Sequence, residues 1–298
     1  MYTIHGAFEG KAHFTMFYVL MKKRRAHDYE KLFNRLQSFC IKEFNFSIFN
    51  ETRIVITDYE KAVFTVLRRY GCHVQGCFFH FTQCVYRKVK QIGLVDEYNK
   101  YNSTVHLYVR LLMMVAFIKP SMKPEVFNDL VRSFSSENLD NGITRQMSIV
   151  FKYFKDTWLN GSIDVNMWYF SGCEMNTNNR CESIHSGFTA MFPNISHPNM
   201  FTLANMICAH EKRQMNDLMT STSTSFVHRE DKRGQSVAET LKVLNSKYSA
   251  GLIQSLKGYL VALNNSFSQS TDYATVRIAP GIDGLMAQVL QVAPLMVK

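Results

Sequence analysis

The chain has 298 residues, of which 46% are hydrophobic and 19% are charged. This balance excludes a disordered chain and allows a full core in one large domain or two moderate ones. The formal net charge of +10 and the pI near 9.2 favour an anionic partner, most simply nucleic acid. Many basic proteins bind nothing acidic, so charge alone does not decide the function.

Seven cysteines, an odd number, are scattered along the sequence. In a chain of this length such a set favours reduced thiols inside the cell over a disulfide framework. The opening "MYTIHGAFEG" lacks the pattern of a secretory signal, and the longest apolar run, "LLMMVAFI", is too short to cross a bilayer. We therefore expect a soluble intracellular protein with no membrane segment.

Residues 1–94 alternate between strand and helix patterns. Two strands, "MYTIH" and "AHFTMFYVLM", are predicted on either side of a turn that holds Gly6 and Gly10, and the basic segment "KKRR" follows. The chain then reads as a helix, the β-branched strand "RIVITD", a second helix, the strand "HVQGCFFH" and a third helix ending near Gly93. Strands separated by helices predict an α/β sheet with parallel neighbours.

Strand signals are absent from residues 95–170, where the apolar spacing predicts three helices. Residues 171–219 predict two more helices, the first opening at "NTNNRCESIH", with Thr177 to Asn179 as capping candidates. The polar stretch 220–236 is typical of a flexible linker. Residues 237–298 are expected to form a helical C-terminal segment, although its end shows no clear pattern.

Asp58 is the first candidate site residue, because it comes directly after the apolar strand "RIVIT". Open α/β sheets carry functional residues beyond the carboxyl ends of their strands, and a carboxylate there can hold Mg²⁺. The local pattern "TDYE" also suits the start of a helix, where Asp58 would only cap the backbone. Locally, capping is the more frequent role of such a residue.

Cys77 and His80 stand three positions apart and suggest a zinc site. A structural zinc site needs four ligands with recognisable pairs, and no second pair follows at the required spacing. We therefore expect no zinc. Packing of a small thiol and a hydrogen-bonded histidine near a strand end explains the two residues better.

Glu182 is the second candidate carboxylate. It is expected in the first turn of a helix, where the helix dipole favours negative charge. Helix electrostatics alone would account for it. Arg180 and His185 flank Glu182 and would either contact a phosphate or face water.

Five segments, in this order and spacing, resemble Mutator-like element (MULE) transposases, which are DDE-class enzymes with a ribonuclease H-like core. The segments are "YTIHG", "YVLMKKRRAHDYEKLF", "ITDYEKAV", "GCFFHFTQCVYRKVKQIGL" and "NTNNRCESIH". The resemblance covers roughly residues 1–215. It implies a ribonuclease H-like mixed sheet in 1–94, an all-helical insertion in 95–170, and helices that complete the core in 171–219.

The resemblance assigns roles that the local patterns leave open. Asp58 falls on the family's second catalytic Asp, Glu182 on its catalytic Glu, and Cys77 with His80 on its CxxH signature, for which we expect a structural or DNA-positioning role. Mg²⁺ or Mn²⁺ would be the cofactor, held by Asp58 and Glu182 among three carboxylates. DNA would be the partner, bound in the nucleus, and a homo-oligomer on transposon ends would fit. The expected DNA contacts are Lys22, Lys23, Arg24, Arg25, Arg180 and His185.

One departure from the family matters most. Its first catalytic Asp lies on a first strand that precedes the segment matching "MYTIHG", and this sequence has no counterpart of that strand; the family's zinc-binding DNA-recognition module has no counterpart either. A ribonuclease H-like sheet places its first strand in the interior, so we expect a gap in backbone pairing and a frayed or wrongly paired "MYTIH".

The sequence therefore predicts a transposase-derived, N-terminally truncated core that is not a competent enzyme by itself. One alternative is a domesticated DNA-binding or chromatin-associated protein without catalysis. Another is an intracellular helical interaction module in which Asp58 and Glu182 only cap helices.

Overall fold

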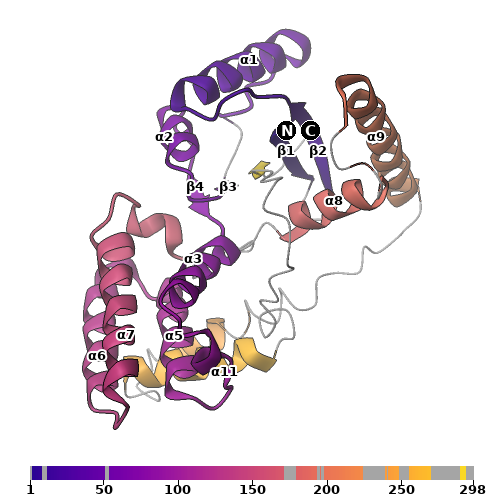
Figure 1. The fold of residues 1–298 in the computed structure, drawn as a ribbon. Helices are drawn as coiled ribbons and strands as arrows, with labels where there is room; N and C mark the ends of the chain where they lie inside the picture. The colour runs from indigo at the N-terminus through magenta and orange to yellow at the C-terminus, as the bar shows by residue number, and fades with distance from the viewer. Residues whose placement is uncertain are drawn as a thin grey trace. The chain divides into compact units, whose positions relative to one another are not determined.

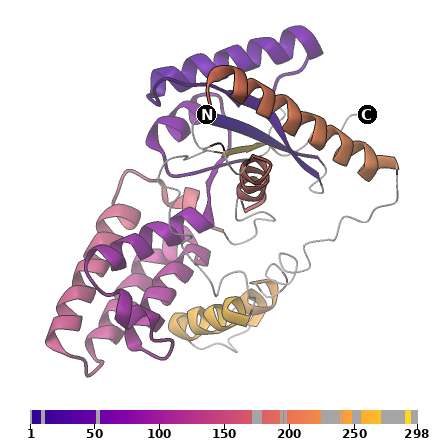
Figure 2. The same ribbon diagram turned by 45° about the vertical axis from the view of Figure 1, so that its right-hand side comes forward.

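The fold was obtained as a computed structural model, which describes residues 2–8, 12–50, 54–170, 179–192, 195, 198–223, 239, 241–247, 255–269 and 289–292. The chain is of α/β type and mostly helical, with a small sheet (Figures 1 and 2). It divides into two compact units. Unit 1 comprises Met1–Cys77, Thr177–Glu230 and Pro280–Lys298, and unit 2 comprises Phe78–Asn176 and Asp231–Ala279.

Unit 1 contains a five-stranded sheet of order β2-β1-β5-β3-β4. The hairpin of β1 (Tyr2–Phe8) and β2 (Ala12–Val19) confirms the two predicted N-terminal strands, but Gly6 lies inside β1 and not in the turn. The strand β3 (Val55–Thr57) pairs in parallel with β4 (Val74–Gly76), as the alternation of strands and helices predicts. All six residues of β3 and β4 are buried, which fits their β-branched and uncharged composition.

The central position of the sheet holds β5 (Val289–Val292), and this corrects two predictions. The C-terminal segment is not wholly helical, and the expected gap is filled. β5 pairs in parallel with four residues of β1 and antiparallel with Val55 and Ile56 of β3. The start of the chain is accordingly well paired, with Tyr2 and Ile4 each 1% exposed. The physical reason is that β1 and β3 both present unpaired backbone groups, which a short apolar segment from elsewhere in the chain can satisfy.

Helices cover both faces of the sheet (Figure 1). On one face lie α1 (Ala26–Phe44) and α2 (Lys61–Arg69); Phe17 of β2 meets Phe39 of α1 there. On the other face lie α8 (Asn179–Ala190) and α9 (Met200–Ser223), and Tyr18 of β2 contacts His210 of α9. Because α9 continues to Ser223, the first four residues of the predicted linker 220–236 are helical; the remainder of that linker lies outside the described residues.

The described part of unit 2 is helical, as predicted for residues 95–170; α3 (Phe78–Gln91), which was predicted in the core of residues 1–94, also belongs to this unit. The other described helices are α4 (Val95–Asn99), α5 (Thr104–Met114), α6 (Lys123–Ser135), α7 (Asn141–Phe154) and α11 (Leu256–Gln269). Short 3₁₀ turns occupy Val115–Phe117, Pro120–Met122 and Val165–Trp168, and a π-helical turn occupies Lys155–Leu159. Aromatic rings fill its core: Phe81 contacts Phe154, Trp158 and Trp168. No helix in the described part of the chain has the length and apolar character needed to span a membrane.

Candidate active site

Asp58 lies at the carboxyl end of β3, as the sequence predicts. The three β3 residues before it are at most 1% exposed, and Asp58 itself is 9% exposed. The capping hypothesis for Asp58 is wrong: the residue that precedes α2 is Glu60, and its side chain makes no capping hydrogen bond. A nearly buried carboxylate that does not cap a helix calls for another explanation.

Three other side chains, Tyr2, Tyr29 and Glu60, interact electrostatically with Asp58, and Arg24 interacts with each of these three; we call the five together the strand-end cluster: Tyr2, Arg24, Tyr29, Asp58 and Glu60. Burial raises the pKa of Glu60, and the Asp58 carboxylate raises it further. A hydrogen bond from the Tyr29 hydroxyl and the charge of Arg24 act in the opposite direction. The cluster thus joins two carboxyl groups, one guanidinium and two phenols at the ends of the central strands.

Tyr2 shows that the strand-end cluster is not a closed hydrogen-bond network. Burial raises the pKa of Tyr2 well above its usual value, and Tyr29, Asp58 and Glu60 add to this effect. The Tyr2 hydroxyl is buried and has no hydrogen-bond partner among the described residues. A buried hydroxyl without a partner is uncommon and is often explained by an ion or water bound beside it.

The oxygen-rich donor set of the strand-end cluster fits a hard cation. Mg²⁺ is usually held by one or two carboxylates together with waters and phosphate oxygens, and Asp58 with Glu60 can supply the carboxylates. Within the described side chains, no group of three His, Cys, Asp or Glu residues converges to form a complete protein cage.

The strand-end cluster lies toward the face of the sheet that α1 covers. Tyr18 contacts His210 of α9, and Thr3 is the β1 partner of Tyr18, so Tyr2 alternates to the opposite face, where its ring meets that of Tyr29 of α1 (5.5 Å between centroids). Asp58 interacts electrostatically with both Tyr2 and Tyr29.

Glu182 lies in the first turn of α8, as predicted from the sequence. The same helix carries Arg180 and His185, and α8 packs against β2. The side chains of these three residues lie outside the described residues, so their distances to Asp58 stay a prediction.

Cys77 and His80 occupy different elements. Cys77 is 0% exposed at the end of β4, where its backbone N–H donates to the carbonyl oxygen of Thr57 (3.0 Å). His80 lies in the first turn of α3, which begins at Phe78; the predicted strand "HVQGCFFH" therefore ends at Gly76, four residues early. Cys77 is thus a neighbour of the strand that ends at Asp58.

The basic segment Lys22–Arg25 connects β2 to α1 and is exposed. Arg25 pairs with Asp28 (2.9 Å) and so holds the first turn of α1. Arg24 belongs to the strand-end cluster, where its charge lowers the pKa of Glu60. The segment therefore brings positive charge up to the Asp58 region and leaves Lys22 and Lys23 exposed.

Sequence reasoning missed Glu60, Tyr2 and Tyr29. The signal for Glu60 was present in "TDYE", two positions after Asp58, but the pattern was interpreted only as the start of a helix. Tyr2 and Tyr29 could not be assigned because they reach the site from β1 and α1.

Compared with protein-family models, curated proteins and solved structures, the chain has no significant match.

Proposed function

We propose that unit 1 is a DDE-type phosphoryl-transfer core, of the MULE transposase kind, that binds DNA but does not cut it in the form described here. One observation carries this proposal: Asp58 stands almost buried at the carboxyl end of β3, in a cluster that includes Arg24 of the basic segment. A carboxylate, a helix with a first-turn Glu182 and neighbouring positive charge are the parts that metal-assisted phosphoryl transfer uses.

In this proposal Asp58 and Glu182 would hold Mg²⁺ or Mn²⁺, and the metal would supply activation of a water or a 3′-hydroxyl and stabilisation of the leaving oxygen. Arg24, with Lys22 and Lys23 beside it, neutralises the phosphates that approach the carboxylates. Tyr29 orients the Glu60 carboxyl by donating a hydrogen bond to it.

The lack of cleavage follows from the strand at the centre of the sheet. β5 reads Val-Leu-Gln-Val and carries no carboxylate in the position next to β3. Glu60 is a poor substitute, since its carboxyl group already accepts from Tyr29 and burial raises its pKa. With only two carboxylates, a metal would not be fixed in line with the scissile phosphate, and a misplacement of about 1 Å can cost on the order of a hundredfold in rate.

A second candidate function is that of a domesticated, transposase-derived protein that binds DNA or chromatin without catalysis. The exposed segment Lys22–Arg25 and the net charge of +10 favour it. Both functions require weak, sequence-tolerant binding to duplex DNA through phosphate contacts, and such binding weakens steeply as salt rises. They differ in whether Asp58 contributes through a bound metal.

A gel-shift titration at increasing salt tests the shared requirement. Removing two phosphate contacts with Lys22→Gln and Lys23→Gln should lower the slope of log affinity against log salt by about 2. The matched control, Lys90→Gln with Lys155→Gln, removes the same charge from exposed positions of unit 2 and should leave the slope unchanged. Equal effects of the two double variants, or binding that does not respond to salt, would contradict the proposed DNA surface.

A further inference from the structure

The outward face of α9 is exposed and apolar. The inward face carries Met206, His210 and Gln214; Met206 and His210 are 5% exposed, and Gln214 hydrogen-bonds to the backbone N–H of Thr15 (2.7 Å). On the opposite side of the helix, large apolar side chains remain in water. Their exposed fractions are 86% for Phe201, 48% for Met215 and 65% for Met219.

These exposed residues form a stripe along the helix. Phe201, Cys208 and Met215 follow one another at intervals of seven, and Asn205, Lys212 and Met219 run beside them at the same interval. Alternating steps of three and four residues produce the seam through which two helices pack against each other. We call these six residues the α9 seam.

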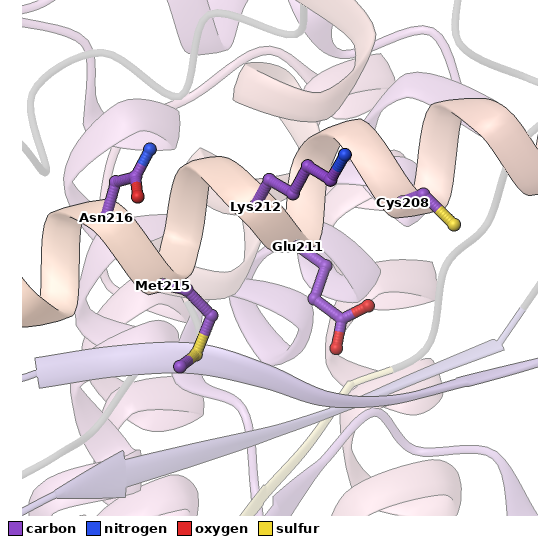
Figure 3. A pocket seen from close by; sticks show the side chains of 5 residues that line it. All are labelled: Cys208, Glu211, Lys212, Met215 and Asn216. Atoms are coloured by element: carbon purple, nitrogen blue, oxygen red, sulfur yellow. The ribbon is translucent and has the colours of Figure 1, made fainter.

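An open, shallow depression in the surface borders the middle of the seam, lined by Cys208, Glu211, Lys212, Met215 and Asn216. In Figure 3 all five side chains come from α9, with Glu211 and Met215 leaving one edge of the helix and Lys212 and Asn216 the other. The space beside the helix is therefore open to side chains from another body.

Two charged residues, Lys212 of the α9 seam and Glu211 beside it, distinguish between arrangements. Glu211 and Lys212 are adjacent and exposed, and among the described residues neither takes part in a salt bridge. A second α9 laid parallel and in register would set Glu211 near Glu211 and Lys212 near Lys212. A second α9 laid antiparallel, about a two-fold axis level with position 210, brings Lys212 of each copy to the turn that holds Glu211 of the other.

We propose that the α9 seam is a homodimer interface in which two copies of this chain pair their α9 helices antiparallel. The same axis sets Phe201 of one copy against Met219 of the other, so both ends of the seam are covered. The inference is independent of the proposed function. One helix pair buries less than the roughly 1,200–2,000 Å² of a standard interface, so the dimer is weak and concentration-dependent.

Charge reversal in the full-length chain, followed by sedimentation velocity over a concentration series, tests this interface. Glu211→Lys and Lys212→Glu each turn two attractive contacts into two repulsive ones and should weaken self-association by roughly tenfold. Mixing the two variants should restore a dimer, because the heterodimer regains opposite charges. A wild-type chain that stays monomeric, or variants that dimerise as well as the wild type, would overturn the proposal.

Covalent trapping tests the antiparallel direction. Phe201→Cys chains mixed with Met219→Cys chains should form a disulfide between the two introduced thiols under mild oxidation, identified by peptide mass. Neither variant alone should link through its introduced thiol, because the two copies of each position lie at opposite ends of the helix pair. Links within Phe201→Cys alone would show a parallel pair and contradict the proposed axis. If the mixed disulfide does not form in a sample that dimerises, the seam is not the interface.

Discussion

Lys123 begins α6 and is 0% exposed, an unusual position for a lysine. Its Nζ lies 3.3 Å from the centroid of the Trp168 ring and donates to the carbonyl oxygens of Val165 (3.3 Å) and Trp168 (3.0 Å). Burial lowers the pKa of Lys123 from 10.5 to about 6. Replacing Lys123 by methionine keeps the chain length and removes the titrating group.

The lowered pKa makes the stability of unit 2 depend on pH. Unfolded Lys123 stays protonated up to about pH 10.5, whereas the folded side chain loses its proton above about pH 6. Between these values the unfolded state binds more protons, so the free energy of unfolding rises with pH by up to about 1.4 kcal/mol per unit. From about pH 7 to about pH 9 the wild-type chain should therefore gain up to about 3 kcal/mol relative to Lys123→Met. Contributions that do not titrate, such as the Trp168 contact, cancel in this comparison.

Tryptophan fluorescence during urea unfolding is the appropriate assay. The chain has two tryptophans, and both Trp158 and Trp168 lie in the core of unit 2, at 1% and 0% exposure. The signal thus reports on the unit that contains Lys123. Lys119→Met, at an exposed lysine, is the matched control and should show no pH-dependent difference. If the difference between wild type and Lys123→Met does not change with pH, Lys123 titrates normally and the reasoning fails.

Three further changes test other parts of the fold. Burial lowers the pKa of His210, which hydrogen-bonds to Tyr18. The stability that neutral His210 contributes is therefore complete above the ordinary histidine pKa of about 6.5 and is lost as pH falls through the lowered value. Far-UV circular dichroism in urea at decreasing pH should show less acid destabilisation for His210→Gln than for wild type. Gln291→Pro removes an N–H from β5 and should speed hydrogen exchange of β1 and β3 amides, whereas Gln291→Thr should not; equal protection in both variants would show that β5 does not hold the sheet together. Gly76 lies against the Tyr59 ring with no room for a Cβ, so Gly76→Ala should lower the free energy of unfolding by about 1–3 kcal/mol, and an unchanged urea midpoint would contradict this packing.

The elements predicted well from the sequence are those whose signal is local. In α1 the residues Tyr29, Phe33, Leu36 and Cys40 recur at helical spacing, and the structure buries all four. The run "RIVITD" likewise indicates a buried strand with Asp58 at its end, because β-branched residues without charge suit the interior of a sheet.

The parts that the sequence did not predict depend on distant partners. β5 is four residues long, and its strand conformation comes from pairing with β1 and β3, more than 200 residues away in the chain. The aromatic run after Gly76 has high strand propensity, yet Phe78 starts a helix because its ring packs among the helices of unit 2, against Phe117 and Phe170. Glu60 was missed for a different reason: its local signal in "TDYE" was interpreted as the start of a helix, whereas its contact with Tyr29 comes from α1.

Nicking of supercoiled plasmid DNA tests the central claim most directly. The full-length chain is incubated with the plasmid and Mg²⁺ or Mn²⁺, at a salt concentration at which the gel shift shows binding, beside Asp58→Ala and the exposed-carboxylate control Asp96→Ala. We predict that all three bind the plasmid and that none converts it to the nicked form, because the proposed metal site has only two carboxylates, Asp58 and Glu182. Metal-dependent nicking by the wild-type chain and by Asp96→Ala, abolished in Asp58→Ala, would contradict this account and show that the site is complete.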